Sequence, residues 1–170
     1  MFSWLKKKGE TADRRVAAVL YQTVERALGK GDPELVRIVA SMAGLLTCVA
    51  YADMDFHERE AERIRALLGG VRGLSAAAVE AILQVLRTDA VRISSAEATV
   101  YARELLELTA EDVRLELLDA LLDVAAADGT ISLAETNVLR PVAHALGLSQ
   151  AQYNRAQARH RDKLGVLQGR

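Results

Sequence analysis

An internal repeat limits the possible folds of this chain more than any other feature. When the sequence is moved along itself by 75 residues, the segment from Leu45 aligns with the segment from Ala120, and seven of 24 positions are identical. A one-residue slip later, Gly73–Ser75 matches Gly147–Ser149. We therefore expect two related halves, at about 33–88 and 109–164, which bury their apolar faces against each other about a pseudo-twofold axis.

Each half reads as helix, acidic turn and helix, because start signals recur where a side-chain oxygen can accept free backbone N–H groups. After a first helix over about 11–28, the predicted starts are Asp32 with Pro33, Asp55 with Glu58, Ser75, Ser94 with Glu97, Thr109 with Asp112, Ser132 with Glu135, and Ser149. Apolar residues make up 51% of the chain and aromatic residues only 4%, as is typical of helix bundles. The sequence predicts an all-α bundle of about seven to eight helices, forming a single domain over 11–165 behind a leader over 1–10.

Charge and hydropathy indicate where such a chain works. Basic and acidic residues nearly balance, 22 against 23, so we expect no nucleic-acid partner. The longest uncharged stretch, Ile38–Ala52, is too short to cross a bilayer and is predicted to be a buried core helix. Cys48 is the only cysteine, which fits the cytoplasm. The leader, with Phe2, Trp4 and Leu5 beside Lys6–Lys8, predicts at most peripheral membrane contact.

Two acidic turns follow equivalent helices of the repeat, and the bundle could bring them to one end. Asp53, Asp55 and Glu60 belong to the first turn, and Asp128 and Glu135 to the second. Carboxylates and carbonyls suit calcium and magnesium, whereas zinc and copper prefer imidazole and thiolate, which are scarce here. The free carbonyls at the preceding helix ends also favour a cation. These five residues are therefore our candidate ligands for calcium or magnesium.

The same acids have a second interpretation as helix caps. Asp55 with Glu58, and Ser132 with Glu135, are capping-box pairs that need no metal. Neither turn is an EF-hand, because the twelfth position of each lacks the bidentate glutamate. A metal site would therefore have to combine ligands from both halves.

The second half resembles the TerB family of tellurite-resistance proteins. The residues that carry the resemblance are Ala127–Gly129, Ile131, Glu135 and the run VLRPVAHALGLSQAQY, and the likeness extends over about 16–154. It implies a helical bundle of two pseudo-symmetric halves behind a short leader. It also implies a cytoplasmic, divalent-metal-binding module of bacterial tellurite-resistance and stress-response systems, which works with a membrane partner of the TerC type.

The family's acidic positions fall on Asp53, Glu60, Asp128 and Glu135. In the first half the chain departs from the family pattern, because Met54 replaces the motif glycine and Asp55 adds a carboxylate. In the second half, Leu133 and Ala134 stand where family members often have acids.

The leading functional prediction is a divalent-cation-binding module for stress response or signalling that acts through a partner protein. The alternative is a metal-independent interaction domain, like the TerB-like domains of co-chaperones, in which the acids cap helices and a groove between the halves binds a partner. We do not expect an enzyme, because no activated nucleophile or tuned acid and base pair is recognisable. The basic last helix, with Arg155, Arg159, His160, Arg161 and Lys163, could meet phosphate or an acidic partner, but a solvated face is the simpler interpretation.

Overall fold

The computed structural model describes residues 18–29, 32–95 and 98–165, and within them the predicted all-α class is confirmed. A helix over 18–28 is followed by α2 (Pro33–Ala50), α3 (Glu58–Gly69), α4 (Ala76–Thr88), α5 (Ala90–Ser95), α6 (Ala98–Leu108), α7 (Glu111–Ala125), α8 (Leu133–Ala145), α9 (Gln150–Ala158) and a 3-10 turn over Arg161–Lys163. Within these residues, β structure is limited to one isolated bridge between Ile131 and Leu164. The predicted leader over 1–10, and 11–17 of the predicted first helix, lie outside the described residues.

Four of the predicted helix starts are confirmed by side-chain caps. The oxygens of Asp32, Ser75, Ser132 and Ser149 accept backbone N–H groups in the first turns of α2, α4, α8 and α9, at 2.9, 3.1, 3.1 and 3.2 Å. Pro33 is the first residue of α2, where a missing N–H costs nothing. Local polar chemistry therefore fixes these ends.

The predicted start of the third helix at Asp55 is wrong. The backbone N–H of Asp55 donates to Asp53 at 3.0 Å, which holds a turn before the helix. The N-cap is instead His57, and α3 begins at Glu58.

Two further predicted starts are also wrong. Ser94 lies inside α5, and its hydroxyl donates to the carbonyl of Val91 at 3.3 Å; its predicted partner Glu97 lies outside the described residues. Thr109 ends α6 rather than starting α7, because its hydroxyl donates to the carbonyl of Leu105 at 2.5 Å. Ala110 takes the N-cap position of α7.

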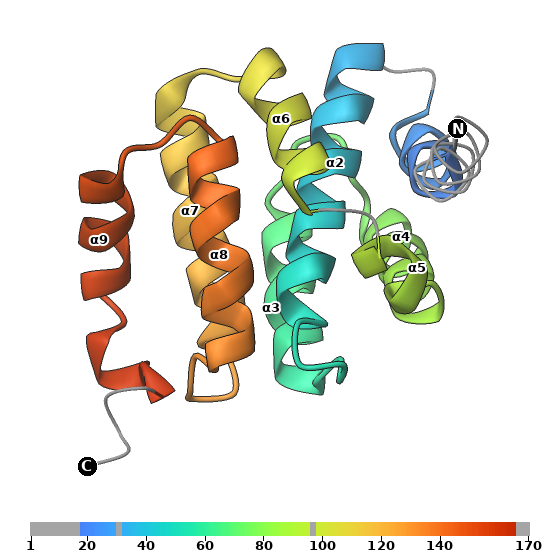
Figure 1. Ribbon diagram of the computed structural model, residues 1–170. Coiled ribbons are helices and arrows are strands. Elements are labelled where there is room, and N and C mark those ends of the chain that lie inside the picture. The colour runs from blue at the N-terminus through green and yellow to red at the C-terminus, as the bar shows by residue number, and fades with distance from the viewer. Residues whose placement is uncertain (1–17, 30–31, 96–97, 166–170) are drawn as a thin grey trace, which may run out of the picture.

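Helix α2 is the centre of the bundle and contacts helices of both halves (Figure 1). It packs tightly against α6 at Gly44, where a Cβ atom would lie only 2.7 Å from the ring of Tyr101. By length and composition alone α2 could cross a membrane, but 67% of it is buried inside the structure. The predicted burial of this apolar stretch is therefore confirmed.

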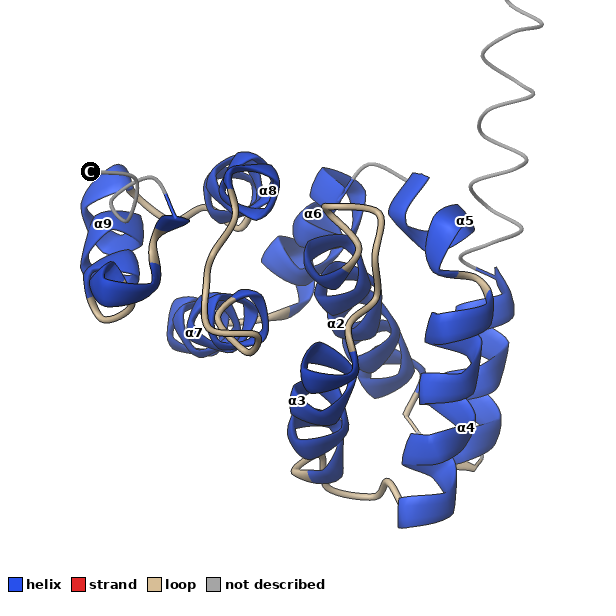
Figure 2. Cartoon of the chain, turned by 90° about the horizontal axis from the view of Figure 1, so that it is seen from below, coloured by secondary structure: helices blue, strands red, loops and turns tan. Residues whose placement is uncertain are grey.

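The two related segments are α2–α3–α4 and α7–α8–α9, which share the order helix, acidic turn, helix, serine-capped helix. The turns after α2 and α7 both lie at the lower end of the bundle in Figure 1, and the view from below in Figure 2 looks onto this end. The expected convergence of the acidic turns is therefore found.

Candidate cation site

The first acidic turn joins α2 to α3 and has a strained backbone. Asp53 Oδ1 accepts the N–H of Asp55 at 3.0 Å, and Met54 between them has a φ of 69°. This left-handed conformation costs a non-glycine residue about 1 to 2 kcal/mol. The side chain of Met54 is 80% exposed, so its burial does little to offset the free-energy cost of this conformation.

The second acidic turn joins α7 to α8 and uses the same hydrogen bond without the strain. Asp128 Oδ1 accepts the N–H of Thr130 at 2.9 Å. Gly129, which aligns with Met54, has a φ of 106°, a conformation that glycine adopts readily. The repeat therefore reproduces the turn geometry, but only the second half has the residue best suited to it.

The end of the described chain ties the second turn to the bundle. The N–H of Ile131 donates to the carbonyl of Lys163 at 2.6 Å, and the N–H of Gly165 donates to the carbonyl of Ile131 at 3.0 Å. Ile131 itself is 1% exposed. The second turn is thus fixed by backbone pairing and by burial together.

Glu60 and Glu135 occupy equivalent positions of the repeat and meet between the halves. They are 2% and 5% exposed and are the only buried charged residues in the described part of the chain. Glu60 accepts the N–H of His57 at 3.1 Å, and Glu135 accepts the N–H of Ser132 at 2.6 Å. Glu135 lies close enough for its negative charge to act on Glu60. Each glutamate therefore completes a helix start and faces its counterpart in the other half.

The two buried carboxyls ionise less readily than free ones. Burial raises the pKa of Glu60 to about 8, and the negative charges of Glu135 and Asp53 add to the rise. Burial also raises the pKa of Glu135, against the hydrogen bonds from Ser132. Glu60 is thus protonated at neutral pH, since two adjacent buried carboxylates cannot both ionise at low cost.

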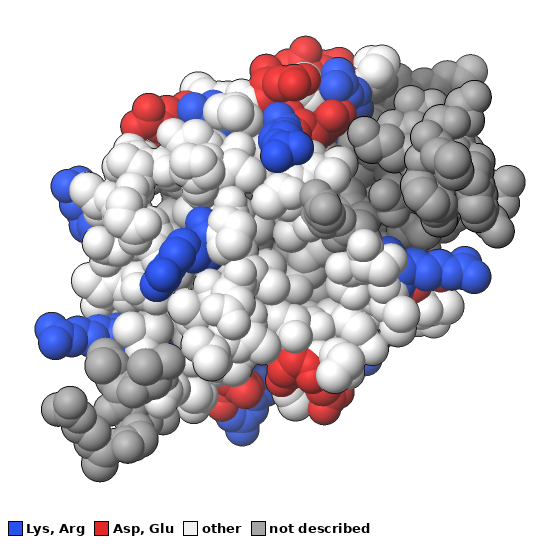
Figure 3. Space-filling view, viewed as in Figure 1, with Lys and Arg blue, Asp and Glu red and all other residues white. Residues whose placement is uncertain are grey.

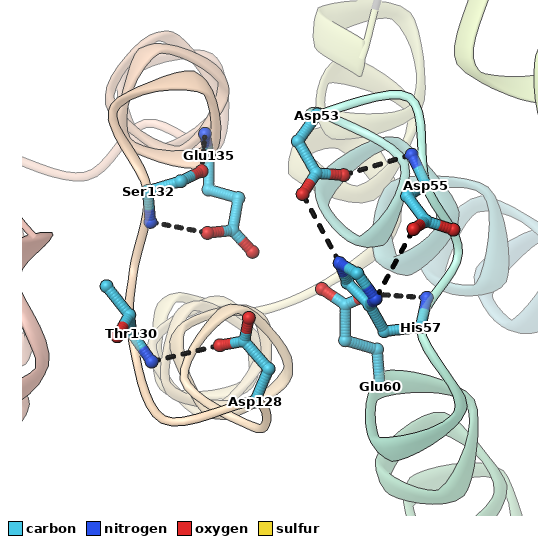
Figure 4. Close-up of polar contacts among 8 residues, drawn as sticks. All are labelled: Asp53, Asp55, His57, Glu60, Asp128, Thr130, Ser132 and Glu135. Carbon is cyan, nitrogen blue, oxygen red and sulfur yellow. Dashed lines mark hydrogen bonds and ion pairs between the residues drawn. The ribbon is translucent and has the colours of Figure 1, made fainter.

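Figure 4 shows the five predicted ligands together. Glu60 and Glu135 point toward each other from facing elements, while Asp53 and Asp128 lie on their own turns beside them. Asp55 is 71% exposed and contacts His57 rather than the glutamates. Among the described residues, no three carboxylate, imidazole or thiolate groups converge as a formed metal centre. Two buried carboxyls with two flanking aspartates nevertheless fit a hard cation by donor type.

His57, which the sequence analysis did not include among the candidate residues, contacts both aspartates of the first turn. Its Nε2 lies 3.4 Å from Asp53 and its Nδ1 lies 3.6 Å from Asp55. The imidazole therefore bridges both exposed aspartates of the first turn. The i, i+4 spacing from Asp53 to His57 was the signal in the sequence, but only the turn geometry makes it meaningful.

Charged side chains elsewhere gather at the ends of the bundle. In Figure 3 the middle of the visible face is largely uncharged, and acidic groups show at the lower edge, where the two turns lie. The basic face at the end of the chain is partly used within the fold, because Arg159 pairs with Asp119 at 2.5 Å and His160 lies 3.5 Å from Asp123. It is therefore less solvated than the simplest interpretation predicted.

Residues 39–158 match the family model described as tellurite resistance protein TerB. The matched segment is more than half of the 170-residue chain and runs from within α2 to the end of α9, so it includes both acidic turns. The comparisons with curated proteins and with solved structures gave no match.

Proposed function

The chain belongs to the TerB family, and from this premise we propose that it is a divalent-cation-binding module, for calcium or magnesium, that acts through a partner protein. The observation that carries the proposal is the pair Glu60 and Glu135. These carboxyls are buried, come from equivalent positions of two halves and lie against each other. Burying two acidic side chains next to each other is costly. If the pair had only a structural role, uncharged side chains at these two positions would give a more stable protein.

A cation would relieve this cost by taking the place of the proton on Glu60. Glu60 and Glu135 would supply two oxygens from the floor of the site, and Asp53 and Asp128 would supply two more from its rim. The last carbonyls of α2 and α7 lie directly before the two aspartates, where the negative ends of both helices favour a cation, although Val49 and Val124 already accept N–H groups of the turns. The ion would contribute charge neutralisation only, and the protein residues would orient it.

The same proposal includes a role outside the binding event. In a stress-response or signalling module, the bound cation would change the surface at the acidic end, and a partner would read the change. A membrane protein of the TerC type is the partner that the family resemblance suggests. We propose a cytoplasmic location and no catalytic activity for the module.

A second candidate is a metal-independent interaction domain. It is supported by the capping roles of Glu60 and Glu135, each of which accepts the N–H of its own N-cap residue. In that case the acids stabilise helix starts, and partner binding is independent of cations.

Thermal unfolding of EDTA-stripped protein separates the two candidates. Calcium, magnesium or manganese at about 100 times the dissociation constant should stabilise by about 2.7 kcal/mol, which raises the melting temperature by about 5 to 10 °C. The shift should disappear in the Asp53→Asn, Asp128→Asn double variant. It should persist in a Glu107→Gln, Glu116→Gln control, which removes two exposed carboxylates of α6 and α7. Identical melts with and without millimolar ion would leave the metal-independent candidate.

A further inference from the structure

A groove between α3 and α7 adjoins the candidate cation site. It has a volume of about 600 Å³, and Arg59, Arg63 and Glu62 of α3 line one wall. Asp123 of α7 and Lys163 line the other side. The exposed edge of α3 thus faces the groove, while its opposite edge, with Glu60, is buried against the core.

Small side chains form the rest of the groove. Ala66 of α3 and Ala126 and Ala127 at the end of α7 line it without filling it. Ala126 is only 3% exposed, so small, closely packed side chains form the floor of the groove. They leave room for an occupant between the charged side chains of the walls.

Only some of the charged side chains in the groove form ion pairs within the protein. Arg63 forms an ion pair with Asp123, and that carboxylate also faces His160. Arg59 and Lys163 have no side-chain hydrogen bond or ion pair to any described residue, and Glu62 is the only uncommitted acid among the lining residues. Two free cations against one free acid favour a ligand that carries negative charge.

The groove ends beside the second acidic turn. Ala127, which lines it, directly precedes the exposed Asp128, one of the four proposed cation ligands. An occupant of the groove therefore ends beside the candidate cation site. Calcium takes six to eight oxygen ligands. The four carboxylates proposed for the site supply only four if each contributes one oxygen.

We infer that the groove between α3 and α7 binds an acidic, extended segment of a partner protein, whose carboxylates pair with Arg59 and Lys163 and reach the cation at the groove's end. The part of this inference that concerns the cation rests on the proposed function. The part that concerns Arg59 and Lys163 does not, because these residues face the groove with or without an ion.

Fluorescence anisotropy with a labelled deca-glutamate peptide tests the groove first, with the full chain in EDTA at low salt. The Arg59→Ala, Lys163→Ala variant should bind the peptide about five- to ten-fold more weakly, since each exposed pair contributes little. An Arg26→Ala, Arg72→Ala control removes the same charge from exposed sites outside the groove and should bind like the wild type. Absent peptide binding, or equal weakening in the control, would overturn the inference.

Two further arms identify the ligand and separate this inference from the proposed function. Inorganic phosphate at matched ionic strength should not displace the peptide; full displacement would indicate a small oxyanion site and overturn the assignment to an acidic segment. Calcium should tighten peptide binding in the wild type but not in Asp53→Asn, Asp128→Asn. Peptide binding in EDTA without any calcium effect on melting would reject only the proposed function. A melt that shifts in calcium, with unchanged peptide affinity, would reject the shared cation.

Discussion

The two acidic turns occupy equivalent positions in the repeat, yet they are held in different ways. In the second turn, Gly129 adopts its left-handed conformation freely, Ser132 caps α8 with its hydroxyl, and Ile131 is paired with the end of the described chain. Each of these features fixes the turn independently. The second turn is therefore the more rigid of the two.

The first turn lacks all three features. Met54 is strained, His57 makes no side-chain cap hydrogen bond, and the side chain of His57 contacts Asp53 and Asp55 instead. The two copies of a repeated turn can therefore diverge, so that one copy is held rigidly and the other can change its conformation. A cation bound between them would be accommodated mainly by movement of the first turn.

The largest expected effect concerns the proton on Glu60, in the helix that follows the first acidic turn. The folded pKa of Glu60 is raised from 4.5 to about 8, so between these values the folded state binds more protons than the unfolded state. The free energy of unfolding should therefore fall as pH rises through this window, by up to about 1.4 kcal/mol per pH unit. Denaturant titrations at several pH values measure the slope.

Glu60→Gln should remove most of this slope and make the protein more stable than the wild type at pH 8. The amide can accept the N–H of His57, as the acid does, and it carries no charge beside Glu135. Glu62→Gln, an exposed neighbour, serves as the control. An unchanged slope in Glu60→Gln would show that the proton resides elsewhere.

The next largest effect concerns the anchor of the second turn. Ile131→Ala should cost about 2 to 4 kcal/mol, because a 1% exposed side chain leaves a cavity under the turn. Leu133→Ala, two residues away and 61% exposed, should stay within about 0.5 kcal/mol of the wild type. Equal costs for both variants would mean that the second turn is not anchored by burial.

A smaller effect separates the two helix starts. Ser132→Ala should cost about 1 kcal/mol, because it removes the oxygen that caps α8. His57→Ala should cost about 0.5 kcal/mol or less, because its side chain makes only half-exposed ion contacts. If chemical denaturation gave the reverse order, the first turn would be the better fixed one.

The smallest effect is a gain. Met54→Gly should stabilise the protein by about 0.5 kcal/mol, because the relief of left-handed strain exceeds the greater chain entropy of glycine only slightly. Gly129→Ala at the equivalent position should instead destabilise it, since alanine would acquire the strain. Thermal melts of both variants measure the difference in sign, and a loss in Met54→Gly would contradict it.

The sequence predicted the fold class and those helix ends that depend on local chemistry. Asp32, Ser75, Ser132 and Ser149 cap helices because a short polar side chain reaches the next free N–H groups whatever the tertiary context. At the wrong starts the side chain has another local partner: the hydroxyls of Ser94 and Thr109 donate to carbonyls of the preceding turn, and the carboxylate of Asp55 faces His57. Competition between two local hydrogen bonds is decided by packing, which the pattern did not contain.

The candidate site was predictable only in part. The repeat aligned Glu60 with Glu135 and so identified both as candidate ligands, but their burial and the raised pKa of Glu60 depend on how the halves pack. The groove depends on how α3 and α7 pack, and the ion pair between Arg63 and Asp123 joins residues that are 60 positions apart in the sequence. No spacing rule within one helix would have found them.

Calorimetry of calcium binding at pH 7, in PIPES and in Tris, tests the central claim most directly. If a cation replaces the proton on Glu60, the heat should differ between the two buffers by the amount expected for about one proton released per ion. The Glu60→Gln variant should lose this difference together with most of the affinity. Binding with the same heat in both buffers, or no binding at millimolar calcium, would contradict the claim that the carboxyl pair is a cation site.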